Sequence, residues 1–290
     1  MKLIPCNNCQ SLEHQFLFSK KSNLGEEFKL VQCKTCKLVF VNPQPSFEEV
    51  GKYYSDEYFT KRSDRGYDNY YSEKIRREIE RVFQLNLSDL DFFAWEKTLS
   101  LEKSTLDIGC AAGYFVAYMQ SRNWEAKGIE IAEGPIQFGR DVLKQTILKN
   151  DFLDWDTTGT EKFTLITLWA SIEHLHKPKE TLEKIHSHLA PNGRMILSTC
   201  RYGILARMGG LNWRFLNVPE HLFYYSRNTI VSQCESIGFK LVKQISYGSG
   251  MTSKKNAGLL FRISKKFFDW FVMFTNQGDM IALVFEKKIS

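Results

Sequence analysis

The feature that most constrains the fold is a regular alternation of short apolar strands and helical segments between residues 105 and 199. The expected strands cover Thr105–Ile108, Ala126–Ile131, Thr146–Phe152, Phe163–Trp169 and Arg194–Thr199. The helical segments between them cover Tyr114–Asn123, Gly134–Lys144 and Lys179–Leu189. Strands that alternate with helices form a parallel sheet covered on both faces, and ligands bind above the carboxyl ends of its strands. The pattern therefore predicts a doubly wound α/β fold.

The loop after the first of these strands has the sequence Gly109-Cys110-Ala111-Ala112-Gly113. A dinucleotide-binding loop uses Gly-x-Gly-x-x-Gly, whose backbone approaches a pyrophosphate at a helix N-terminus. The present loop has only two glycines, Gly109 and Gly113. A ligand can therefore pass close to the backbone, but the loop does not cradle a diphosphate.

With Leu106-Asp107-Ile108 before it, this loop resembles motif I of the class I S-adenosylmethionine-dependent methyltransferases. The resemblance implies a seven-stranded, mostly parallel sheet whose last strand, Met280–Phe285, is antiparallel. It also implies a set of cofactor-binding residues in motif I and after the following strands: Asp107, Gly109, Cys110, Gly113, Glu130, Asp151, Phe152 and Trp169.

Two acidic residues of this set would recognise the ribose and the adenine of the cofactor. The resemblance implies that Glu130 accepts hydrogen bonds from both ribose hydroxyls and that Asp151 accepts one from the adenine amine. Phe152 would supply a backbone donor and an apolar wall. Taken alone, Glu130 could instead end a solvated strand, Asp151 could belong to a turn, and Asp107 could cap a helix. Gly109, Glu130 and Asp151 are spaced 21 residues apart and 21 again, and together they predict one cofactor crevice.

Residues 169–175 and 217–226 resemble two motifs of the subgroup that includes the ubiquinone-biosynthesis O-methyltransferases. Members of this subgroup that bind a divalent metal use Glu-x-x-Glu-His in the first motif, and Ala170 replaces the first of these acids. A metal with only Glu173 and His174 lacks a ligand. The sequence therefore predicts no metal ion in the active site.

Methyl transfer from a sulfonium is an in-line displacement that depends mainly on positioning. An oxygen or carbon-acid acceptor must also lose a proton, a task that suits a histidine. We expect His221 to be this base, with His174 hydrogen-bonding to cofactor or substrate and Glu173 as a third candidate catalytic residue. The alternative for each histidine is a structural hydrogen bond.

Four of the seven cysteines form two Cys-x2-Cys pairs near the N-terminus, Cys6 with Cys9 and Cys33 with Cys36. Two such knuckles supply the four thiolates of a tetrahedral zinc site, and so small a segment needs a metal for stability. We expect residues 1–45 to form a zinc ribbon with structural zinc. The alternatives are a vestigial site and a redox dithiol. The segment resembles the zinc-binding module fused to methyltransferases of sugar and polysaccharide pathways.

Residues 46–101 have the pattern of a helical connector, which starts at the capping box formed by Ser46 and Glu49. An aromatic cluster in this connector could line a pocket, but we expect it to pack against the next domain. The cluster comprises Tyr53, Tyr54, Tyr58, Phe59, Tyr67, Tyr70 and Tyr71. Residues 102–290 are then expected to form the methyltransferase domain.

Residues 201–225 are too long for a plain link between a strand and a helix, and they predict a substrate lid. Arg201, Arg207 and Arg214 in this segment would suit a phosphate or carboxylate, such as that of a nucleotide-linked sugar. The alternative is a solvated basic loop.

Residues 254–274 combine lysines with aromatic residues. We expect an amphipathic element that packs on the sheet, and the alternative is an interfacial helix that contacts anionic lipid. Its apolar run is far shorter than the ~20 residues that cross a bilayer. The N-terminus shows no signal-peptide core, so we expect a cytoplasmic protein.

These features predict an S-adenosylmethionine-dependent methyltransferase that acts on a small molecule, a sugar or glycan precursor, at oxygen or carbon. One alternative is an rRNA or tRNA base methyltransferase that uses the ribbon to bind RNA. A formal net charge of +6 is modest for that role, so nucleic acid is not the expected partner. A second alternative is a non-enzymatic docking protein on a degenerate methyltransferase fold.

Overall fold

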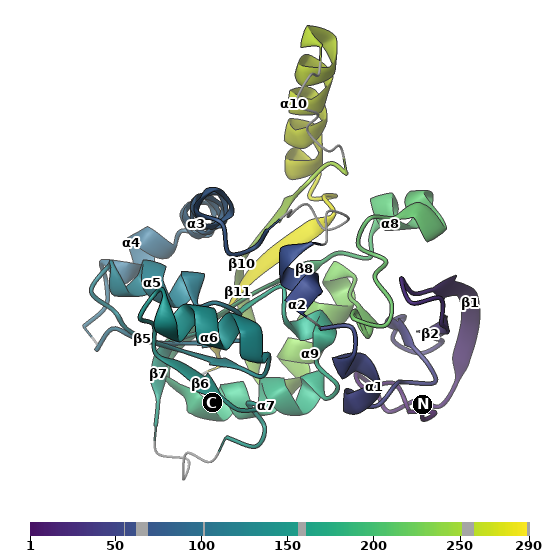
Figure 1. The fold of residues 1–290 in the computed structure, drawn as a ribbon, viewed down its shortest axis with the longest axis horizontal. Helices are drawn as coiled ribbons and strands as arrows, with labels where there is room; N and C mark the ends of the chain where they lie inside the picture. Colours follow the sequence, from purple (N-terminus) through teal and green to yellow (C-terminus); the bar gives the residue numbers. More distant parts are fainter. Residues whose placement is uncertain (55, 62–68, 101, 156–160, 251–257, 289–290) are drawn as a thin grey trace.

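The computed structural model describes residues 1–290 apart from 55, 62–68, 101, 156–160, 251–257 and 289–290. Its main element is a seven-stranded sheet with the strand order β10-β11-β8-β7-β4-β5-β6 (Figure 1). The strands are β4 (Ser104–Ile108), β5 (Glu125–Glu130), β6 (Ile147–Lys149), β7 (Phe163–Trp169), β8 (Leu189–Cys200), β10 (Phe239–Tyr247) and β11 (Met280–Lys287). All neighbouring pairs are parallel except those of β11, which is antiparallel to β8 and β10. The predicted doubly wound, seven-stranded, mostly parallel sheet is confirmed.

Helices cover both faces of this sheet. One face carries α3 (Glu73–Asp89), α5 (Tyr114–Gln120) and α6 (Glu133–Asp141), and the other carries α7 (Pro178–His188) and α9 (Arg227–Ile237). Because side chains alternate along a strand, β7 contributes Leu165 to the core on the first face and Ile166 and Leu168 to the core on the second. The shorter elements are α4 (Phe92–Glu96), η2 (Ile172–His174), α8 (Ile204–Gly209) and η3 (Gly210–Asn212).

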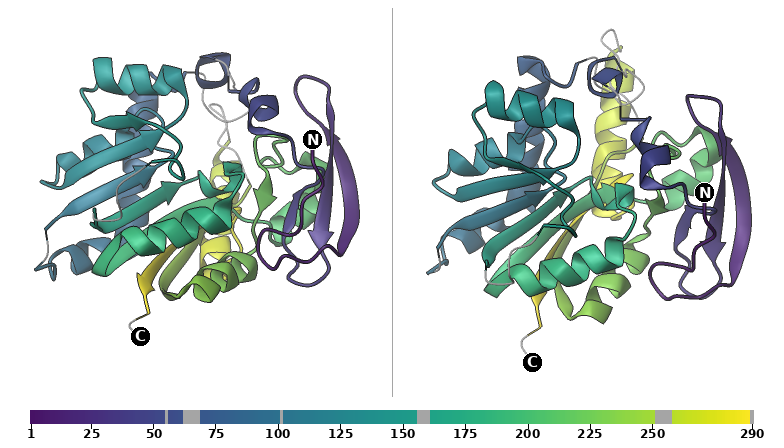
Figure 2. Two further views of the ribbon diagram at one scale, coloured as in Figure 1. Left: turned by 90° about the horizontal axis from the view of Figure 1, so that it is seen from below. Right: turned by 60° about the horizontal axis from the view of Figure 1, so that its bottom comes forward.

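A second, antiparallel sheet contains the N-terminal residues. Its first three strands are β1 (His14–Lys21), β2 (Glu27–Cys33) and β3 (Val39–Val41). Its fourth strand, β9 (Phe223–Tyr224), comes from the lid segment and pairs with β3. Figure 2 shows this sheet standing beside the main one. The N-terminal module and the lid segment therefore share one sheet.

The connector contains α1 (Phe47–Gly51) and α2 (Asp56–Thr60), and its aromatic residues pack against the main domain. The ring centroids of Tyr70 and Tyr114 lie 5.1 Å apart, and those of Tyr71 and Phe138 lie 4.6 Å apart. The expected packing role is confirmed for these residues, and Tyr67 lies outside the described residues. The capping box at Ser46 is also present.

Helix α10 (Leu259–Phe274) corrects one expectation, because it extends away from the body of the molecule (Figure 1) instead of packing on the sheet. Val272 is its one buried residue. An amphipathic pattern specifies an apolar face but not what covers it, which is why the prediction was wrong. Lys254 and Lys255 lie outside the described residues. Within the described part of the chain, no helix has both the length and the apolar character needed to cross a membrane.

Candidate active site and metal centre

The loop after β4 makes a turn that only small residues allow. Gly109 and Gly113 have φ angles of 69° and 74°, which glycine adopts without strain. A Cβ atom at Gly109 would lie 2.7 Å from the Cβ of Ser171. The Ser171 hydroxyl donates a hydrogen bond to the carbonyl oxygen of Ile108 at 2.9 Å. The loops after β4 and β7 are therefore packed together at the carboxyl edge of the sheet.

The Glu130 carboxylate holds this loop in place. Its Oε2 accepts a hydrogen bond from the Ala111 amide at 2.9 Å, and its Oε1 accepts from the amides of Ile131 and Ala132 at 2.7 and 2.9 Å. A carboxylate offers about four lone-pair positions. Three of these positions are occupied, so Glu130 keeps one that can accept a hydrogen bond from a hydroxyl of a bound ligand.

Asp107 lies buried beneath the same loop. The Thr167 hydroxyl donates to its Oδ1 at 2.6 Å. Burial raises the pKa of Asp107 to about 7, although the Thr167 hydrogen bond acts in the opposite direction. Asp107 therefore joins β4 to β7 through a hydrogen bond and has no exposed charge to offer a ligand.

Cys110 is buried and Trp169 is half-buried beside the loop. A Cβ atom at Gly128 would lie 2.3 Å from the Cys110 sulfur, so this thiol fills the space that glycine leaves. The Trp169 ring packs against the rings of Phe83 and Phe115, with centroids 5.2 and 5.3 Å away. Its Nε1 is buried without a partner among the described residues. A buried indole N–H is costly unless it donates a hydrogen bond, so this group is suited to a ligand.

The predicted adenine contacts lie just beyond β6, which ends at Lys149, earlier than the sequence pattern suggested. The Asp151 Oδ1 accepts a hydrogen bond from the Leu153 amide at 2.7 Å. The Phe152 ring is buried in the core, 6.0 Å from the Trp155 ring. The contacts of Asp151 and Phe152 with adenine stay predictions.

The three candidate catalytic residues come together. Glu173, His174 and His221 offer ligand atoms that all lie within 4.8 Å of one another. The two imidazole rings are 4.7 Å apart and nearly perpendicular. The backbone fixes this arrangement, because the Leu222 amide donates to the Glu173 carbonyl oxygen at 2.8 Å.

His174 is positioned by two groups that sequence reasoning missed. The Tyr54 hydroxyl and the Glu220 carbonyl oxygen each lie 2.7 Å from Nδ1 of His174. Tyr54 had been predicted only as part of the aromatic cluster. Nothing in a single sequence pairs residue 54 with residue 174, so the contact could not be found without the fold.

Glu173 is the most buried member of this cluster, with 1% of its surface exposed. Burial raises its pKa to about 7, although a hydrogen bond from the Thr199 side chain acts against this. Its Oε2 has no partner among the described residues. A carboxyl group with a pKa near neutrality can hold or release a proton beside two imidazoles.

The same three donors could hold a divalent metal ion, because imidazole and carboxylate groups suit several of these metals. The prediction of no active-site metal considered ligands in residues 170–174 alone. The fold adds His221 from a distant segment, so a three-donor set exists without an acid at position 170. The absence of a metal stays a prediction.

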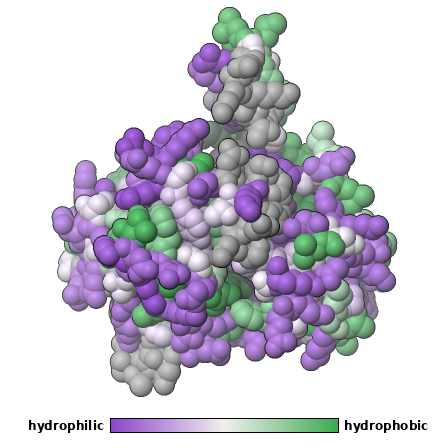
Figure 3. All heavy atoms as spheres, viewed as in Figure 1, coloured by the Kyte–Doolittle hydropathy of each residue, from purple (hydrophilic) through white to green (hydrophobic). Residues whose placement is uncertain are grey.

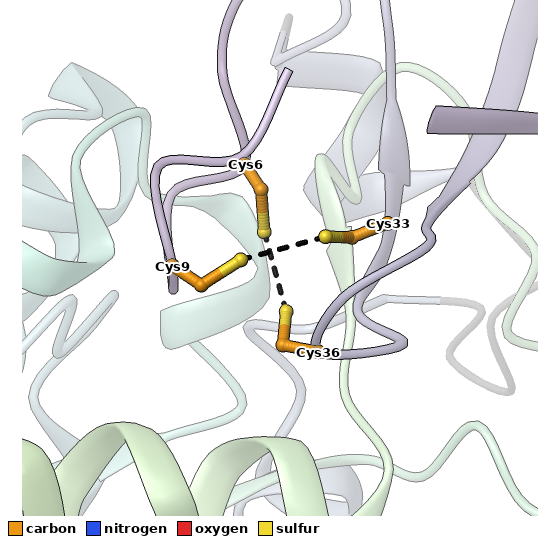
Figure 4. Close-up of side chains that lie close together, drawn as sticks. All are labelled: Cys6, Cys9, Cys33 and Cys36. Atoms are coloured by element: carbon orange, nitrogen blue, oxygen red, sulfur yellow. Dashed lines mark hydrogen bonds between the residues drawn. The ribbon is translucent and has the colours of Figure 1, made fainter. Parts of the chain in front are cut away.

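The four N-terminal cysteines direct their sulfur atoms toward a common centre (Figure 4). The sulfurs of Cys6 and Cys36 are 3.4 Å apart, and those of Cys9 and Cys33 are 3.5 Å apart. All four lie within 4.8 Å of one another, and none forms a disulfide. A tetrahedral zinc ion with Zn–S bonds of about 2.3 Å separates its ligands by about 3.8 Å. The four thiols therefore fit zinc.

The cysteine cluster is connected to the segment that carries His221. Asn7, in the first knuckle, accepts a hydrogen bond from the Lys179 amide at the start of α7, at 3.0 Å. The Val41 amide, shortly after the second knuckle, donates to the Leu222 carbonyl oxygen at 2.9 Å. The N-terminal module thus holds the backbone of the residue next to His221.

The predicted lid does not present three free arginines. Arg201 is buried and donates to the backbone carbonyl of Asn276. Its expected role in binding a phosphate is therefore wrong, because the guanidinium is already used inside the protein. Arg207 and Arg214 are exposed.

A comparison with protein families shows to which family of proteins the chain belongs. A family model described as a methyltransferase domain matches residues 67–244. The chain belongs to this methyltransferase family. The match contains the loop after β4, Glu130, and both histidines of the cluster.

Curated relatives of this methyltransferase point in the same direction. It is 28% identical over 131 residues to a ubiquinone biosynthesis O-methyltransferase of Histophilus somni, covering 42% of this chain and 55% of the relative. It is 24% identical over 190 residues to one of Azoarcus, covering 60% and 78%. The chain thus spans about half the length of the first relative.

A solved structure shares the fold. The crystal structure of an S-adenosylmethionine-dependent methyltransferase from Archaeoglobus fulgidus matches with a TM-score of 0.52 and 16% identity, covering 73% of this chain and 94% of that chain. The assignment to the class I methyltransferases is confirmed.

Proposed function

We propose that this methyltransferase transfers a methyl group from S-adenosylmethionine to an oxygen or acidic carbon of a small molecule, with His221 as the general base. The observation that carries the proposal is the contact between Gly109 and Ser171. It joins the loop predicted to bind the cofactor to the segment that continues into Glu173 and His174. The cofactor loop and the base cluster therefore lie at one edge of the sheet.

The cofactor would be held by groups that already have the required chemistry. Glu130 has one remaining acceptor position for a ribose hydroxyl, and the buried Trp169 N–H can donate to an acceptor on the ligand. Asp151 is proposed to accept from the adenine amine. The bound cofactor supplies an electrophilic methyl group on a positively charged sulfur.

In the proposed reaction, the acceptor atom attacks the methyl carbon in line with the carbon–sulfur bond. The electron pair of that bond stays on sulfur, and the acceptor's proton passes to the His221 imidazole. His174, positioned by Tyr54, packs edge-on against His221 and restricts its orientation. Glu173 can exchange a proton with either ring. These residues contribute mainly by positioning and proton transfer.

The proposed acceptor is a sugar or glycan precursor, and a nucleotide-linked sugar is the form we favour. Arg207 and Arg214 are exposed on the lid and could bind a phosphate group. The four-cysteine module supports this class through its resemblance to modules of sugar methyltransferases. We also propose that these cysteines bind structural zinc, which would stabilise the small N-terminal sheet.

Calorimetry and turnover assays test this proposal. We expect heat on titration with S-adenosylmethionine and cofactor-dependent methylation within a panel of nucleotide sugars, small phenols and RNA. Methylation of RNA alone would favour the alternative of an RNA methyltransferase. If S-adenosylmethionine does not bind even at high protein concentration, the proposed methyltransferase activity is excluded.

A histidine series tests the base. With the acceptor found in the panel, His221→Gln should lower kcat roughly 100-fold or more, while the affinity for S-adenosylmethionine stays near that of the wild type. His186→Gln, on α7, is the matched control and should retain activity. Normal turnover by His221→Gln would show that another group takes the proton.

A further inference from the structure

Helix α10 exposes an apolar face along its whole length. Seven exposed side chains form this face: Leu259, Leu260, Ile263, Phe267, Trp270, Phe271 and Phe274. At 100° per residue they cover one continuous arc of about 120°. The buried side of the helix, around Val272, is a different one. The face is therefore separate from the surface that joins α10 to the protein.

The aromatic residues of this face form a continuous surface. The Phe267 ring lies 6.0 Å from Trp270 and 6.5 Å from Phe271, and the Trp270 ring stacks on Phe274 at 5.4 Å. Figure 3 shows hydrophobic residues at the free end of the helix, at the top of the view. A contiguous apolar patch of several hundred Å² is uncommon on a monomer and marks an interaction surface.

Basic residues border the face on one side. Arg262 and Lys266 are exposed, and neither takes part in an ion pair among the described residues. Lys265 differs, because it pairs with Asp269 at 2.5 Å. A helix with a broad aromatic and aliphatic face beside cationic residues is the pattern of a helix that lies in a membrane interface. Lys and Arg side chains can then reach the lipid headgroups.

Charge distinguishes a lipid surface from a second copy of the chain. Two copies packed through α10 would place Arg262 and Lys266 near their own equivalents. Asp269 is the single acid of this helix, and both its oxygens are already used, by Ser249 and Lys265. Anionic headgroups supply the negative charge that a second α10 lacks.

We propose that α10 docks this methyltransferase on a membrane surface that contains anionic phospholipid, with its apolar face inserted among the acyl chains. Arg262 and Lys266 contact the headgroups. The proposal does not depend on the acceptor or on His221, and it gives the chain a location at the membrane surface.

Vesicle sedimentation with the full chain tests the proposal. We expect binding to vesicles of phosphatidylcholine mixed equally with phosphatidylglycerol, and much weaker binding to phosphatidylcholine alone. Arg262→Glu combined with Lys266→Glu should lower the affinity for the mixed vesicles roughly 30-fold, since each surface cation contributes a factor of roughly five. Trp270→Ser combined with Phe271→Ser should lower it about tenfold or more.

Matched controls separate the helix from general charge and hydrophobicity. Lys240→Glu combined with Lys288→Glu changes the net charge equally but lies at the opposite end of the β10–β11 pair, so it should bind like the wild type. Val142→Ser removes an exposed apolar side chain elsewhere. Equal loss in the two charge variants, or α10-dependent dimers in solution without vesicle binding, would overturn the proposal.

Discussion

The loop after β4 and the cluster of Glu173, His174 and His221 lie at the same edge of the sheet, but they are built differently. The loop is held by Glu130, 19 residues from the Ala111 amide that it binds. The cluster depends on Tyr54, 120 residues from His174, and on the pairing of β3 with β9. Cofactor binding should therefore survive damage to the N-terminal module, whereas acceptor chemistry should not.

The largest expected effect is the loss of cofactor affinity when the loop after β4 loses the Glu130 carboxylate. Glu130→Ala removes the acceptor for three backbone amides and for the ribose, and should weaken binding of S-adenosylmethionine roughly 100-fold or more. Titration calorimetry measures this. Glu133→Ala, a nearby exposed acid, should bind normally. Unchanged affinity in Glu130→Ala would show that the cofactor binds elsewhere.

Metal removal tests the independence of the two regions. Chelation of the proposed zinc, or Cys9→Ser, should lower turnover about tenfold or more, because β9 loses its support. The affinity for S-adenosylmethionine should remain near that of the untreated protein. Amide exchange at Val41 should accelerate, and added zinc should restore both properties after chelation. If the affinity for S-adenosylmethionine fell together with turnover, cofactor binding would also depend on the N-terminal module.

A smaller effect is expected from the connector. Tyr54→Phe removes the hydroxyl beside His174 and should lower kcat about fivefold, with little change in KM for S-adenosylmethionine. Tyr53→Phe is the matched control, because that hydroxyl binds Glu26 in the N-terminal module. If both variants lose activity equally, the effect is structural and not specific to His174.

The smallest effect concerns stability against pH. Glu173 has a pKa raised to about 7 by burial, so the folded state binds its proton more tightly than the unfolded state. Its contribution to stability is present at low pH and is lost as the pH rises through 7, by about 1 kcal/mol between pH 6 and pH 8. Glu173→Gln should show a correspondingly flatter dependence in urea unfolding. An unchanged slope would mean that Glu173 is ionised throughout.

The difference between the two regions also explains what the sequence could predict. The strands, the helices and the loop at Gly109 depend on local patterns and on a parallel topology that follows from them. The cysteine cluster was predictable because four identical ligands occur at fixed spacing. The packing of Tyr70 and Tyr71 against the main domain was predictable because they belong to an aromatic cluster in a short connector.

Other features depend on contacts between distant segments. The hydrogen bond between Tyr54 and His174, the position of His221 beside Glu173, and the burial of Arg201 all require the folded arrangement. Helix α10 is a different case. Its apolar face was evident from the sequence, but the sequence did not specify whether the sheet would cover that face.

The β9 strand has a consequence for how the protein can be divided. The proposed boundary at residue 45 separates segments of the chain, but β3 pairs with Phe223 and Tyr224 from far beyond it. A fragment that ends there would expose Val39, Phe40 and Val41 as an open apolar sheet edge, which favours aggregation. The N-terminal module is therefore not a cassette that can be expressed alone or exchanged between methyltransferases unless β9 is transferred with it.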